Sequence, residues 1–276
     1  MSKIDVVKWA FTLGNKPQTF LGAKWISTLL KKLPASKKRI WALRILSLSP
    51  HYFINADAPE FRGMRNDEYL ETVFQVYFDS RIKIYDKVFK SYMRENFTVL
   101  DYGCGPGILA KIAAPFIEKI YGLDISAGAI ACAKILNSAP NVEYIIADEK
   151  GIKSIPDCCA DVIFSLHVVQ HLTDEVFESY LETCRKKLKS NGLLLLHIQL
   201  TDDVWHTEEE WKADRSLLGK IRYRYDLHCF GRTEQEHFEL VSKHGFEDIE
   251  FKNFDDLLEE EFENVHSQRL LIARKK

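Results

Sequence analysis

The sequence predicts an α/β fold built on a doubly wound sheet, and three observations support that prediction. From Phe97 onward, short apolar segments with the character of buried strands alternate with helical segments. Three of the apolar segments end in an aspartate, at Asp101, Asp124 and Asp148. A glycine-rich turn follows the first of them. Because the carboxyl ends of parallel strands share one edge, where open α/β folds bind ligands, we expect a binding crevice at that edge.

The chain before this alternation predicts a helical extension over residues 1–95, ahead of a domain formed by residues 96–276. Residues 1–50 hold ten Lys or Arg against Asp5 alone, although the whole chain has a formal net charge of only −2. The extension and the domain are therefore expected to meet different partners, or each other.

Two helices are expected within residues 1–50. Leu21, Trp25, Leu29 and Leu33 recur every four positions, as on one face of a helix that Pro34 ends. Ser36 is expected to cap the second helix, which runs through Ile40–Leu48. Two interpretations stay open: a cap packed on the following domain, or a basic amphipathic segment that lies on an anionic membrane surface or presents a lipid-linked substrate.

The glycine turn lies within Thr98–Lys111, ahead of a helix expected over Ile108–Ala114. Its glycines are Gly103, Gly105 and Gly107. Glycine accepts positive φ and has no Cβ, so the backbone can approach a ligand closely. The carboxylate of Asp101, just before the turn, would repel a pyrophosphate and favours a ligand with a positively charged end.

The stretch Val99–Leu109 resembles motif I of the class I S-adenosylmethionine-dependent methyltransferases, and the segment ending in H-L-T-D resembles motif IV. The resemblance implies a Rossmann-like, doubly wound, seven-stranded sheet with an antiparallel last strand. It also implies S-adenosyl-L-methionine as the cofactor, whose ammonium and sulfonium supply the positive charge. In this family the helix before the first strand often covers the cofactor, so Tyr77 and Arg81 are candidates for ligand contact, with core packing as the alternative.

The resemblance also assigns the acids at the next two strand ends. Asp124 follows Asp101 at the spacing of an acid that hydrogen-bonds ribose hydroxyls; the alternative is a helix N-cap ahead of Ser126–Leu136. Asp148, or Glu149 beside it, resembles the acid that contacts the adenine amino group. The full set of expected cofactor-binding residues is Asp101, Gly103, Cys104, Gly105, Gly107, Asp124, Ile125, Asp148, Glu149 and Leu166.

The remaining elements follow in order. Thr173 is expected to cap a helix that Asn191-Gly192 stops. The acidic run Asp255–Glu263 is expected to be solvated surface. A long segment, Thr201–Gly231, is expected to shape the substrate pocket. The expected strands are Lys119–Leu123, Val142–Ala147, Asp161–Leu166, Leu193–Gln199, Phe246–Phe251 and Arg269–Ala273, and the expected helices of this half are Asp174–Leu188 and Glu234–His244.

Histidines are the available general bases for methyl transfer to a hydroxyl. The candidates are His167 and His171, after the fourth strand, and His197, near the end of the fifth. Each has a structural alternative, His197 most of all because it lies in an apolar run. His228 and Tyr225 are candidates for substrate contact. Methylation of an amine would need no dedicated base.

Composition and motifs exclude several classes of protein. No apolar run reaches the roughly 18 residues of a membrane span, and no signal peptide is visible. The six cysteines form no C-x-x-C pair, which indicates reduced thiols and a cytoplasmic location. No divalent-metal constellation is evident, and the alternative left open is a site formed by Asp161 with Asp202 or Asp203. Ser165-Leu166-His167-Val168 replaces the motif typical of nucleic-acid amino-methylating enzymes, and the acidic domain disfavours sustained phosphate contact. No nucleic-acid partner is therefore expected, with RNA contact through the basic first fifty residues as the minor alternative.

Three functions compete at this stage. The first is a methyltransferase that acts on an O or N atom of a small molecule, such as a sugar or secondary metabolite. The second is an NAD-dependent oxidoreductase, which the glycine spacing and Asp101 oppose. The third is a non-catalytic scaffold or membrane-surface module with a cofactor-type fold, which the charged N-terminus favours. Nothing in the sequence indicates the oligomeric state.

Overall fold

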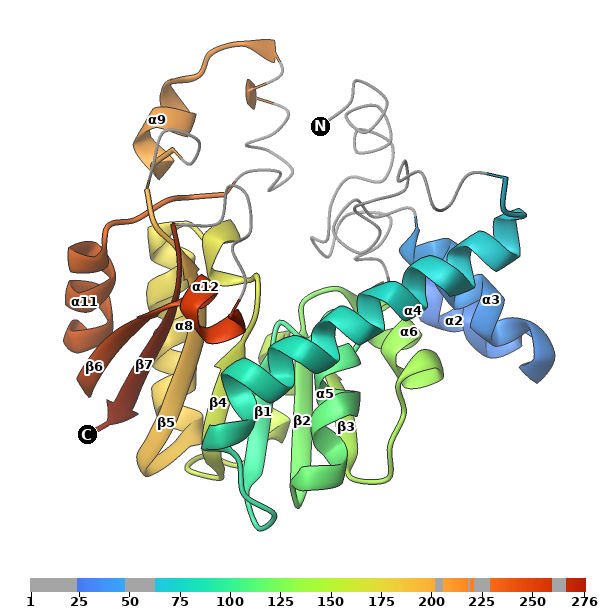
Figure 1. Ribbon diagram of the computed structural model, residues 1–276, viewed down its shortest axis with the longest axis horizontal. Coiled ribbons are helices and arrows are strands. Elements are labelled where there is room, and N and C mark those ends of the chain that lie inside the picture. The colour runs from blue at the N-terminus through green and yellow to red at the C-terminus, as the bar shows by residue number, and fades with distance from the viewer. Residues whose placement is uncertain (1–23, 48–62, 202–205, 218, 221–228, 260–266) are drawn as a thin grey trace.

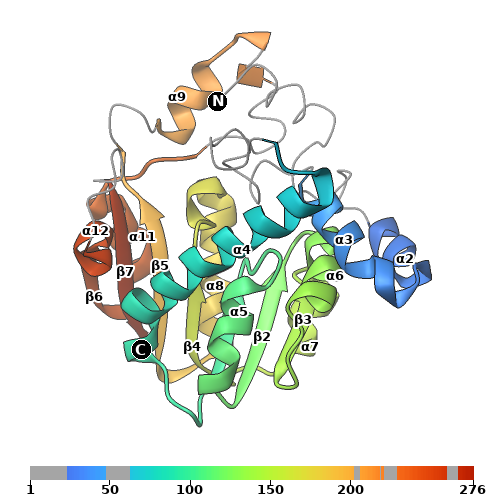
Figure 2. The same ribbon diagram turned by 45° about the vertical axis from the view of Figure 1, so that its right-hand side comes forward.

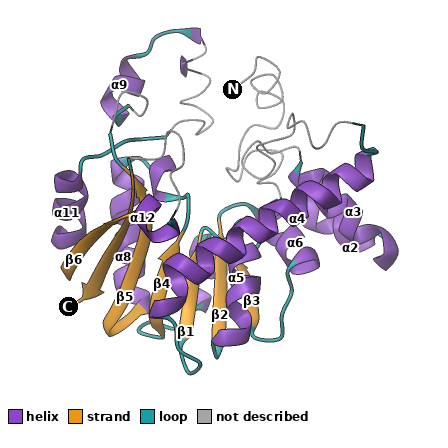
Figure 3. Cartoon of the chain, viewed as in Figure 1, coloured by secondary structure: helices purple, strands orange, loops and turns teal. Residues whose placement is uncertain are grey.

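A computed structural model describes residues 24–47, 63–201, 206–217, 219–220, 229–259 and 267–276. They form a seven-stranded sheet in the order β3-β2-β1-β4-β5-β7-β6, in which β7 runs antiparallel to both of its neighbours. The predicted fold class is confirmed, including the antiparallel last strand (Figure 3). The strands are β1 Thr98–Tyr102, β2 Lys119–Asp124, β3 Val142–Ile146, β4 Ala160–Ser165, β5 Leu188–Gln199, β6 Phe246–Asn253 and β7 Gln268–Lys275.

Helices cover both faces of the sheet (Figures 1 and 2). The long helix α4 crosses one face together with α5 and α6, while α8 lies behind the strands. The helices of the first face are α4 Asn66–Ile84, α5 Ile108–Ala113, α6 Ala127–Leu136 and α12 Phe254–Leu258, extended by the π-helical turn η2 Tyr85–Phe89. Those of the second face are α7 Glu149–Ser154, α8 Asp174–Lys187 and α11 Glu234–Lys243.

Successive side chains of β5 point to opposite faces of the sheet and so pack against different helices. Leu194 and Leu196 point into the cluster that contains α8, whereas Leu195 belongs to the cluster of α4, α5 and α12. His197 continues the second set and packs on Phe254 of α12. A polar side chain is thereby held inside the apolar layer beneath α4 and α12.

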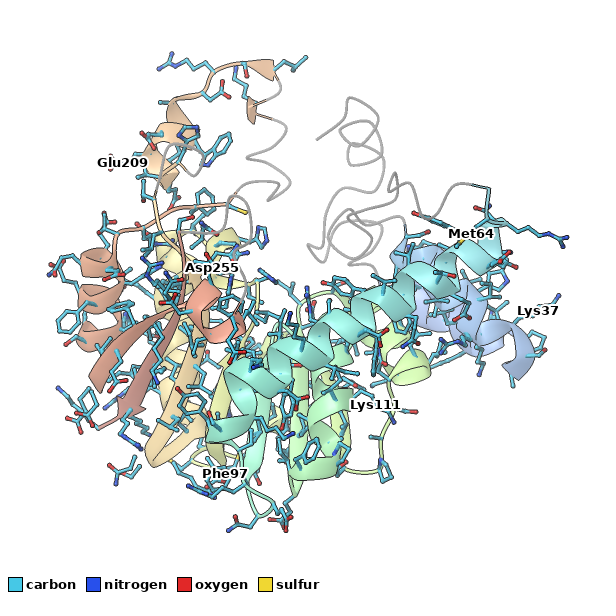
Figure 4. The ribbon with its side chains drawn as sticks, viewed as in Figure 1. Lys37, Met64, Phe97, Lys111, Glu209 and Asp255 are labelled. Atoms are coloured by element: carbon cyan, nitrogen blue, oxygen red, sulfur yellow. The ribbon has the colours of Figure 1, made fainter. Side chains whose placement is uncertain are left out.

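The binding edge is the one where the parallel strands end. Phe97 lies at the lower end of β1 in Figure 4, so the carboxyl ends of β1 to β5 lie at the upper edge. The short helix α9, Glu208–Ala213, stands above this edge, where Glu209 is labelled. It lies within the expected insertion Thr201–Gly231, of which residues 201, 206–217, 219–220 and 229–231 are described.

The boundary between α8 and β5 differs from the expectation. Thr173 caps α8 as predicted, but the helix ends at Lys187 and β5 begins at Leu188, so Asn191-Gly192 does not stop the helix. The physical reason is that Leu188 is fully buried and pairs with Ala160 of β4. Asn191 instead takes a positive φ of 61° inside the irregular start of the strand.

The face that α2, Trp25–Lys32, buries was also predicted wrongly. Trp25 is 46% exposed and Leu29 is 37% exposed, whereas Ile26 and Leu30 are buried. Both pairs repeat every four residues, so spacing alone could not choose between them. The buried pair packs in the cluster formed with α3, α4 and Cys132 of α6.

The second N-terminal helix, α3, spans Ala35–Leu46 and starts before Ser36. Pro34 precedes the helix, and its carbonyl accepts a bond from Lys37 N, so the expected Ser36 cap is wrong. The division of the chain at residues 95 and 96 stays a prediction. Val88 and Phe89, ahead of that boundary, pack in the same core as the strands.

Two further observations concern surface character. Asp255 is only 7% exposed, so the expectation of a solvated acidic run is wrong for this residue, which lies in the first turn of α12. Within the described residues, every helix is too short or too polar to cross a lipid bilayer.

Candidate active site

The glycine turn is tied to the neighbouring strand by backbone bonds. The amides of Gly103 and Cys104 donate to the carbonyl of Leu123 at the end of β2, at 2.7 and 2.8 Å. Gly103 has a φ of +93°, and a Cβ there would collide with Val168, which follows β4. Only glycine satisfies both conditions, because a side chain adds strain at this φ and fills the space. The glycine turn therefore lies directly against the segment that follows β4.

Asp124 is held in place by two backbone donors. Its Oδ2 accepts from Gly105 N and its Oδ1 from Ser126 N, both at 2.8 Å. The N-cap of α6 is Ser126, whose side chain accepts from Ala129 N, so the capping alternative for Asp124 is wrong. Burial raises the pKa of Asp124, and the two N–H bonds oppose that rise. Each carboxylate oxygen keeps a lone pair for a further donor.

Asp101 is the buried carboxyl beside it. The side chain is 2% exposed, and its Oδ2 has no hydrogen-bond partner among the described residues. Burial, followed by the charge of Asp124, raises the pKa of Asp101 to about 8. A buried acceptor without a donor costs free energy, and a cationic ligand would satisfy it. This is the observation by which the crevice fits a ligand with an ammonium or sulfonium group.

Cys104, between Gly103 and Gly105, is buried. Burial raises the pKa of its thiol well above the ordinary value, so it is a small neutral side chain in the turn rather than a reactive nucleophile.

The third strand end differs from the first two. Asp148 caps α7 by accepting from Gly151 N at 2.8 Å, and its other oxygen pairs with Lys24 Nζ of the N-terminal region at 3.3 Å. The bond from Gly151, followed by Lys24, lowers the pKa of Asp148. Glu149 is largely exposed and pairs with Lys153. The assignment of either acid to the adenine amino group stays a prediction.

Two apolar side chains complete the expected cofactor set. Ile125, next to Asp124, is 49% exposed, whereas Leu166, at the end of β4, is 9% exposed. An exposed Ile beside a buried carboxylate offers an apolar contact to a flat ligand ring at the crevice.

A pair of histidines lies at the carboxyl ends of β4 and β5. Their ring centroids are 4.3 Å apart, with an edge-to-face angle of 63°. His167 takes a positive φ of 58°, which is uncommon outside glycine and marks a position worth functional attention. His197 is fully buried; its Nε2 lies 2.8 Å from Gln268 Oε1 and therefore donates. Its Nδ1 has no partner among the described residues.

Burial lowers the pKa of both histidines, which favours the neutral imidazole at pH 7. Burial, followed by the charges of His197, Arg81 and His171, lowers the pKa of His167 well below its ordinary value. Burial lowers the pKa of His197 to about 4, although the bond to Gln268 opposes this. A neutral imidazole can accept a proton, but a lowered pKa makes it a weaker base.

His171 lies on the 3-10 turn η5, Val169–His171, with its Nδ1 3.9 Å from Cys229 Sγ. Phe230 N donates to the carbonyl of Gln170 at 2.6 Å, so the end of the insertion closes over this turn. His228 and Tyr225 lie outside the described residues. The catalytic assignment of His167, His171 and His197 stays a prediction.

Sequence reasoning missed two residues of this cluster and gave little weight to a third. Gln268 and Phe254 contact His197 from β7 and α12, and no motif marks them. Arg81 of α4 influences both histidines through its charge. Its spacing on the helix was the only available signal, and that signal suits core packing equally well.

Comparison with known proteins finds similarity over part of the chain. Residues 100–196 match a family model described as a methyltransferase domain. The ubiquinone biosynthesis O-methyltransferase of Chelativorans sp. is 29% identical over 104 residues, 37% of this chain and 40% of that protein. The phosphoethanolamine N-methyltransferase of Plasmodium falciparum is 27% identical over 182 residues, 64% of this chain and 65% of that protein. The chain thus spans between 40% and 65% of the length of these two relatives.

Solved structures agree on the fold. Phosphoethanolamine N-methyltransferase 2 of Haemonchus contortus, in complex with S-adenosylmethionine, has a TM-score of 0.51 at 18% identity, covering 71% of this chain and 52% of that protein. Human N-acetylserotonin methyltransferase in complex with S-adenosylmethionine has a TM-score of 0.51 at 17% identity, covering 99% of this chain and 70% of that protein.

Proposed function

We propose that this chain, which belongs to the class I S-adenosylmethionine-dependent methyltransferase family, transfers a methyl group to an O or N atom of a small molecule such as a sugar or secondary metabolite. One observation supports the proposal above the others. Two buried carboxyls meet at the glycine turn, Asp124 anchored by two backbone donors and Asp101 with an unpaired oxygen. That combination suits a ligand with neighbouring hydroxyls and a positive charge.

The residues of the crevice divide the recognition of S-adenosylmethionine. Asp124 would accept hydrogen bonds from the ribose hydroxyls, and Asp101 in its ionised form would attract the ammonium group. Gly103 and its neighbours let the backbone come close because no Cβ intervenes. When bound, the cofactor supplies an electrophilic methyl group on a positively charged sulfur.

The histidines support a role for this chain in moving a proton from the acceptor. A neutral imidazole at the end of β4 can take the proton of a hydroxyl, which is worth about 10²–10⁴-fold in rate. His167 is the better placed for contact because it is partly exposed, whereas His197 is fully buried and would act by holding the His167 ring. His171 is an alternative base. An amine acceptor would leave all three dispensable.

The N-terminal helices support a second candidate, a membrane-surface or lipid-linked-substrate contact. Residues 24–47 contain no acidic residue and seven Lys or Arg. Trp25, Leu29 and Trp41 are exposed among these cations. Basic segments with exposed aromatic residues bind anionic lipid surfaces. Co-sedimentation with phosphatidylserine vesicles, lost in Trp25→Ala/Leu29→Ala, is the expected result; no binding of intact protein would exclude the contact.

We also propose a cytoplasmic location. All six cysteines are unpaired, and the reducing cytoplasm keeps thiols in that state. Cell fractionation of the natural source should find the protein in the cytosolic fraction or, if the membrane contact holds, on the cytoplasmic face of the membrane fraction. Recovery from a secreted fraction would contradict the location.

The function is tested by product formation. Purified protein is incubated with S-adenosylmethionine and panels of hydroxylated and amine-bearing small molecules, and S-adenosylhomocysteine and methylated products are measured by mass spectrometry. We expect turnover with at least one acceptor and its loss in Asp124→Ala. Glu118→Ala is the matched control, because this exposed acid lies just before the amino end of β2. Cofactor binding without turnover on any acceptor would instead favour the non-catalytic alternative.

A further inference from the structure

A partly buried arginine stands on the acceptor side of the crevice. Arg81 lies near the end of α4, and its guanidinium donates to the hydroxyl of Tyr77 one turn earlier. The same guanidinium lies 4.1 Å from the centroid of the Tyr77 ring. Among the described residues, no carboxylate within ion-pair distance of Arg81 is found. A cation in that situation has only part of its hydrogen-bonding capacity satisfied.

The other arginines make this environment informative. Those that are partly or fully buried in the described chain each pair with a carboxylate: Arg44 with Asp67, Arg232 with Asp174 and Arg269 with Glu234. The arginines without such a partner are exposed to water, for example Arg65 and Arg94. Arg81 alone, among the arginines that the structure describes, combines partial burial with the lack of an ion pair. Burial of an unpaired cation costs free energy, which an incoming anion would recover.

Among the described residues, the groups that interact with Arg81 are the Tyr77 side chain and, through charge, two histidines. Its charge contributes to lowering the pKa of both His167 and His197, after the larger effect of burial. No carboxylate is among the groups that shift the pKa of His167. Because Tyr77 accepts from Arg81 through its oxygen, its own O–H proton is still available for donation. The cluster therefore has positive potential beside the proposed base.

We propose that Arg81 and Tyr77 form an oxyanion-binding site, so that the methyl acceptor carries a carboxylate or phosphate group. The proposal rests on the proposed function, since it assigns the substrate class of the same site. A guanidinium binds either group through two parallel N–H donors, and the Tyr77 hydroxyl adds a third. Anchoring an anionic group at α4 would leave the rest of the acceptor to face His167.

Titration of the histidines by NMR tests this directly. The pKa of His167 and His197 is measured in wild type, Arg81→Gln, Arg81→Lys and the control Arg94→Gln, with assignments from His167→Gln and His197→Gln. Arg81→Gln should raise both pKa values because a positive charge is removed. Inorganic phosphate or acetate should raise them in wild type and in Arg94→Gln, but not in Arg81→Gln. Unchanged titration on adding either anion to wild type would overturn the proposal.

The two anions are distinguished by affinity. The affinities for inorganic phosphate and for acetate are measured from the same changes in histidine titration. The anion that binds more tightly indicates whether the acceptor carries a phosphate or a carboxylate group. Arg81→Gln should weaken binding of that anion about tenfold or more. Arg81→Lys keeps the positive charge but loses the two parallel donors, so its affinity should lie between those of wild type and Arg81→Gln. Equal binding in wild type and Arg81→Gln would contradict the site.

Failure of this inference is separable from failure of the methyltransferase proposal. S-adenosylhomocysteine binding is measured on the same samples, and Arg81→Gln should leave it unchanged because Asp101 and Asp124 are intact. Cofactor binding without anion binding would overturn only the oxyanion site. Anion binding that persists without any cofactor binding would instead count against the methyltransferase proposal alone.

Discussion

The two ends of the crevice are built on opposite electrostatic principles. At β1 and β2, buried carboxyls face a glycine turn, and backbone donors hold one of them. At β4 and β5, the polar groups are histidines with lowered pKa values and an arginine nearby, and among the described residues no acid is named as a cause of the shift at His167. One end suits a cationic cofactor and the other an anionic or neutral acceptor. If both ligands bind as proposed, this contrast would separate them by charge.

Removing the candidate base should have the largest effect on the acceptor end. For a hydroxyl acceptor, His167→Ala should lower kcat by about 10²–10⁴-fold, because general-base assistance is lost. The measurement is steady-state kinetics, with S-adenosylhomocysteine binding as the check that the cofactor end is unaffected. His171→Ala is the comparison variant. A larger loss in His171→Ala than in His167→Ala would transfer the base assignment to His171.

The contact between Gly103 of the glycine turn and Val168 after β4 joins the two ends of the crevice. Substitution there should give the next largest effect, a loss of stability. Gly103→Ala adds a Cβ at positive φ, costing roughly 1–2 kcal/mol, and crowds Val168, costing about 1–3 kcal/mol more. Chemical denaturation measures the loss of unfolding free energy. Gly103→Ala/Val168→Ala should recover the crowding part when compared with Val168→Ala alone. If the two substitutions were simply additive, Gly103 and Val168 would not be in contact.

The cofactor end should show a pH dependence set by Asp101. Its folded pKa is raised to about 8 from an ordinary value of 3.8, so the folded state holds the proton more tightly than the unfolded state. Its contribution to stability is therefore complete below about pH 4 and is lost as the pH rises through about 8. Unfolding midpoints of wild type should fall over that range, and those of Asp101→Asn should fall less.

Ligand binding should depend on the same group with the opposite sign. A cationic cofactor prefers the ionised carboxylate, so its affinity should rise between pH 6 and pH 8.5 with release of a proton. Asp101→Asn should bind about tenfold more weakly at pH 8.5, the value of one lost charge-assisted bond, and nearly as well as wild type at pH 6. Calorimetry in two buffers measures both quantities. A flat pH profile in wild type would contradict the role of Asp101.

The smallest effect concerns the support of the histidine pair. Gln268→Leu removes the acceptor for His197 Nε2–H. Since that bond raises the pKa of His197, its loss should lower the value further below about 4. We expect only a few-fold decrease in kcat, with KM unchanged, because His197 is fully buried and acts through the His167 ring. NMR titration and kinetics on the same variant measure the two effects; a pKa that rose would show that the bond is absent in solution.

The two ends also differ in how far the sequence could predict them. The cofactor end is local: strand, acid, glycine turn and the next strand's acid follow one another within Val99–Asp124, so the motif determined the geometry. The acceptor end gathers Arg81, His167, His197 and Gln268 from four separate elements, and no short-range signal joins them. Sequence patterns predicted the wrong buried face on α2, because two sets of apolar residues repeat there with the same four-residue spacing. The structure buries Ile26 and Leu30.

The most direct measurement is calorimetric titration of the purified protein with S-adenosylmethionine, S-adenosylhomocysteine and NADH, in wild type, Asp124→Ala and Glu118→Ala. We predict binding of the first two ligands by wild type and Glu118→Ala. Asp124→Ala should lose about 10²-fold or more in affinity, since hydrogen bonds to a charged group contribute about 1.5–3 kcal/mol each. Thermal unfolding confirms that the variant is folded. Binding of NADH alone, or equal affinity in Asp124→Ala, would contradict the assignment of this crevice.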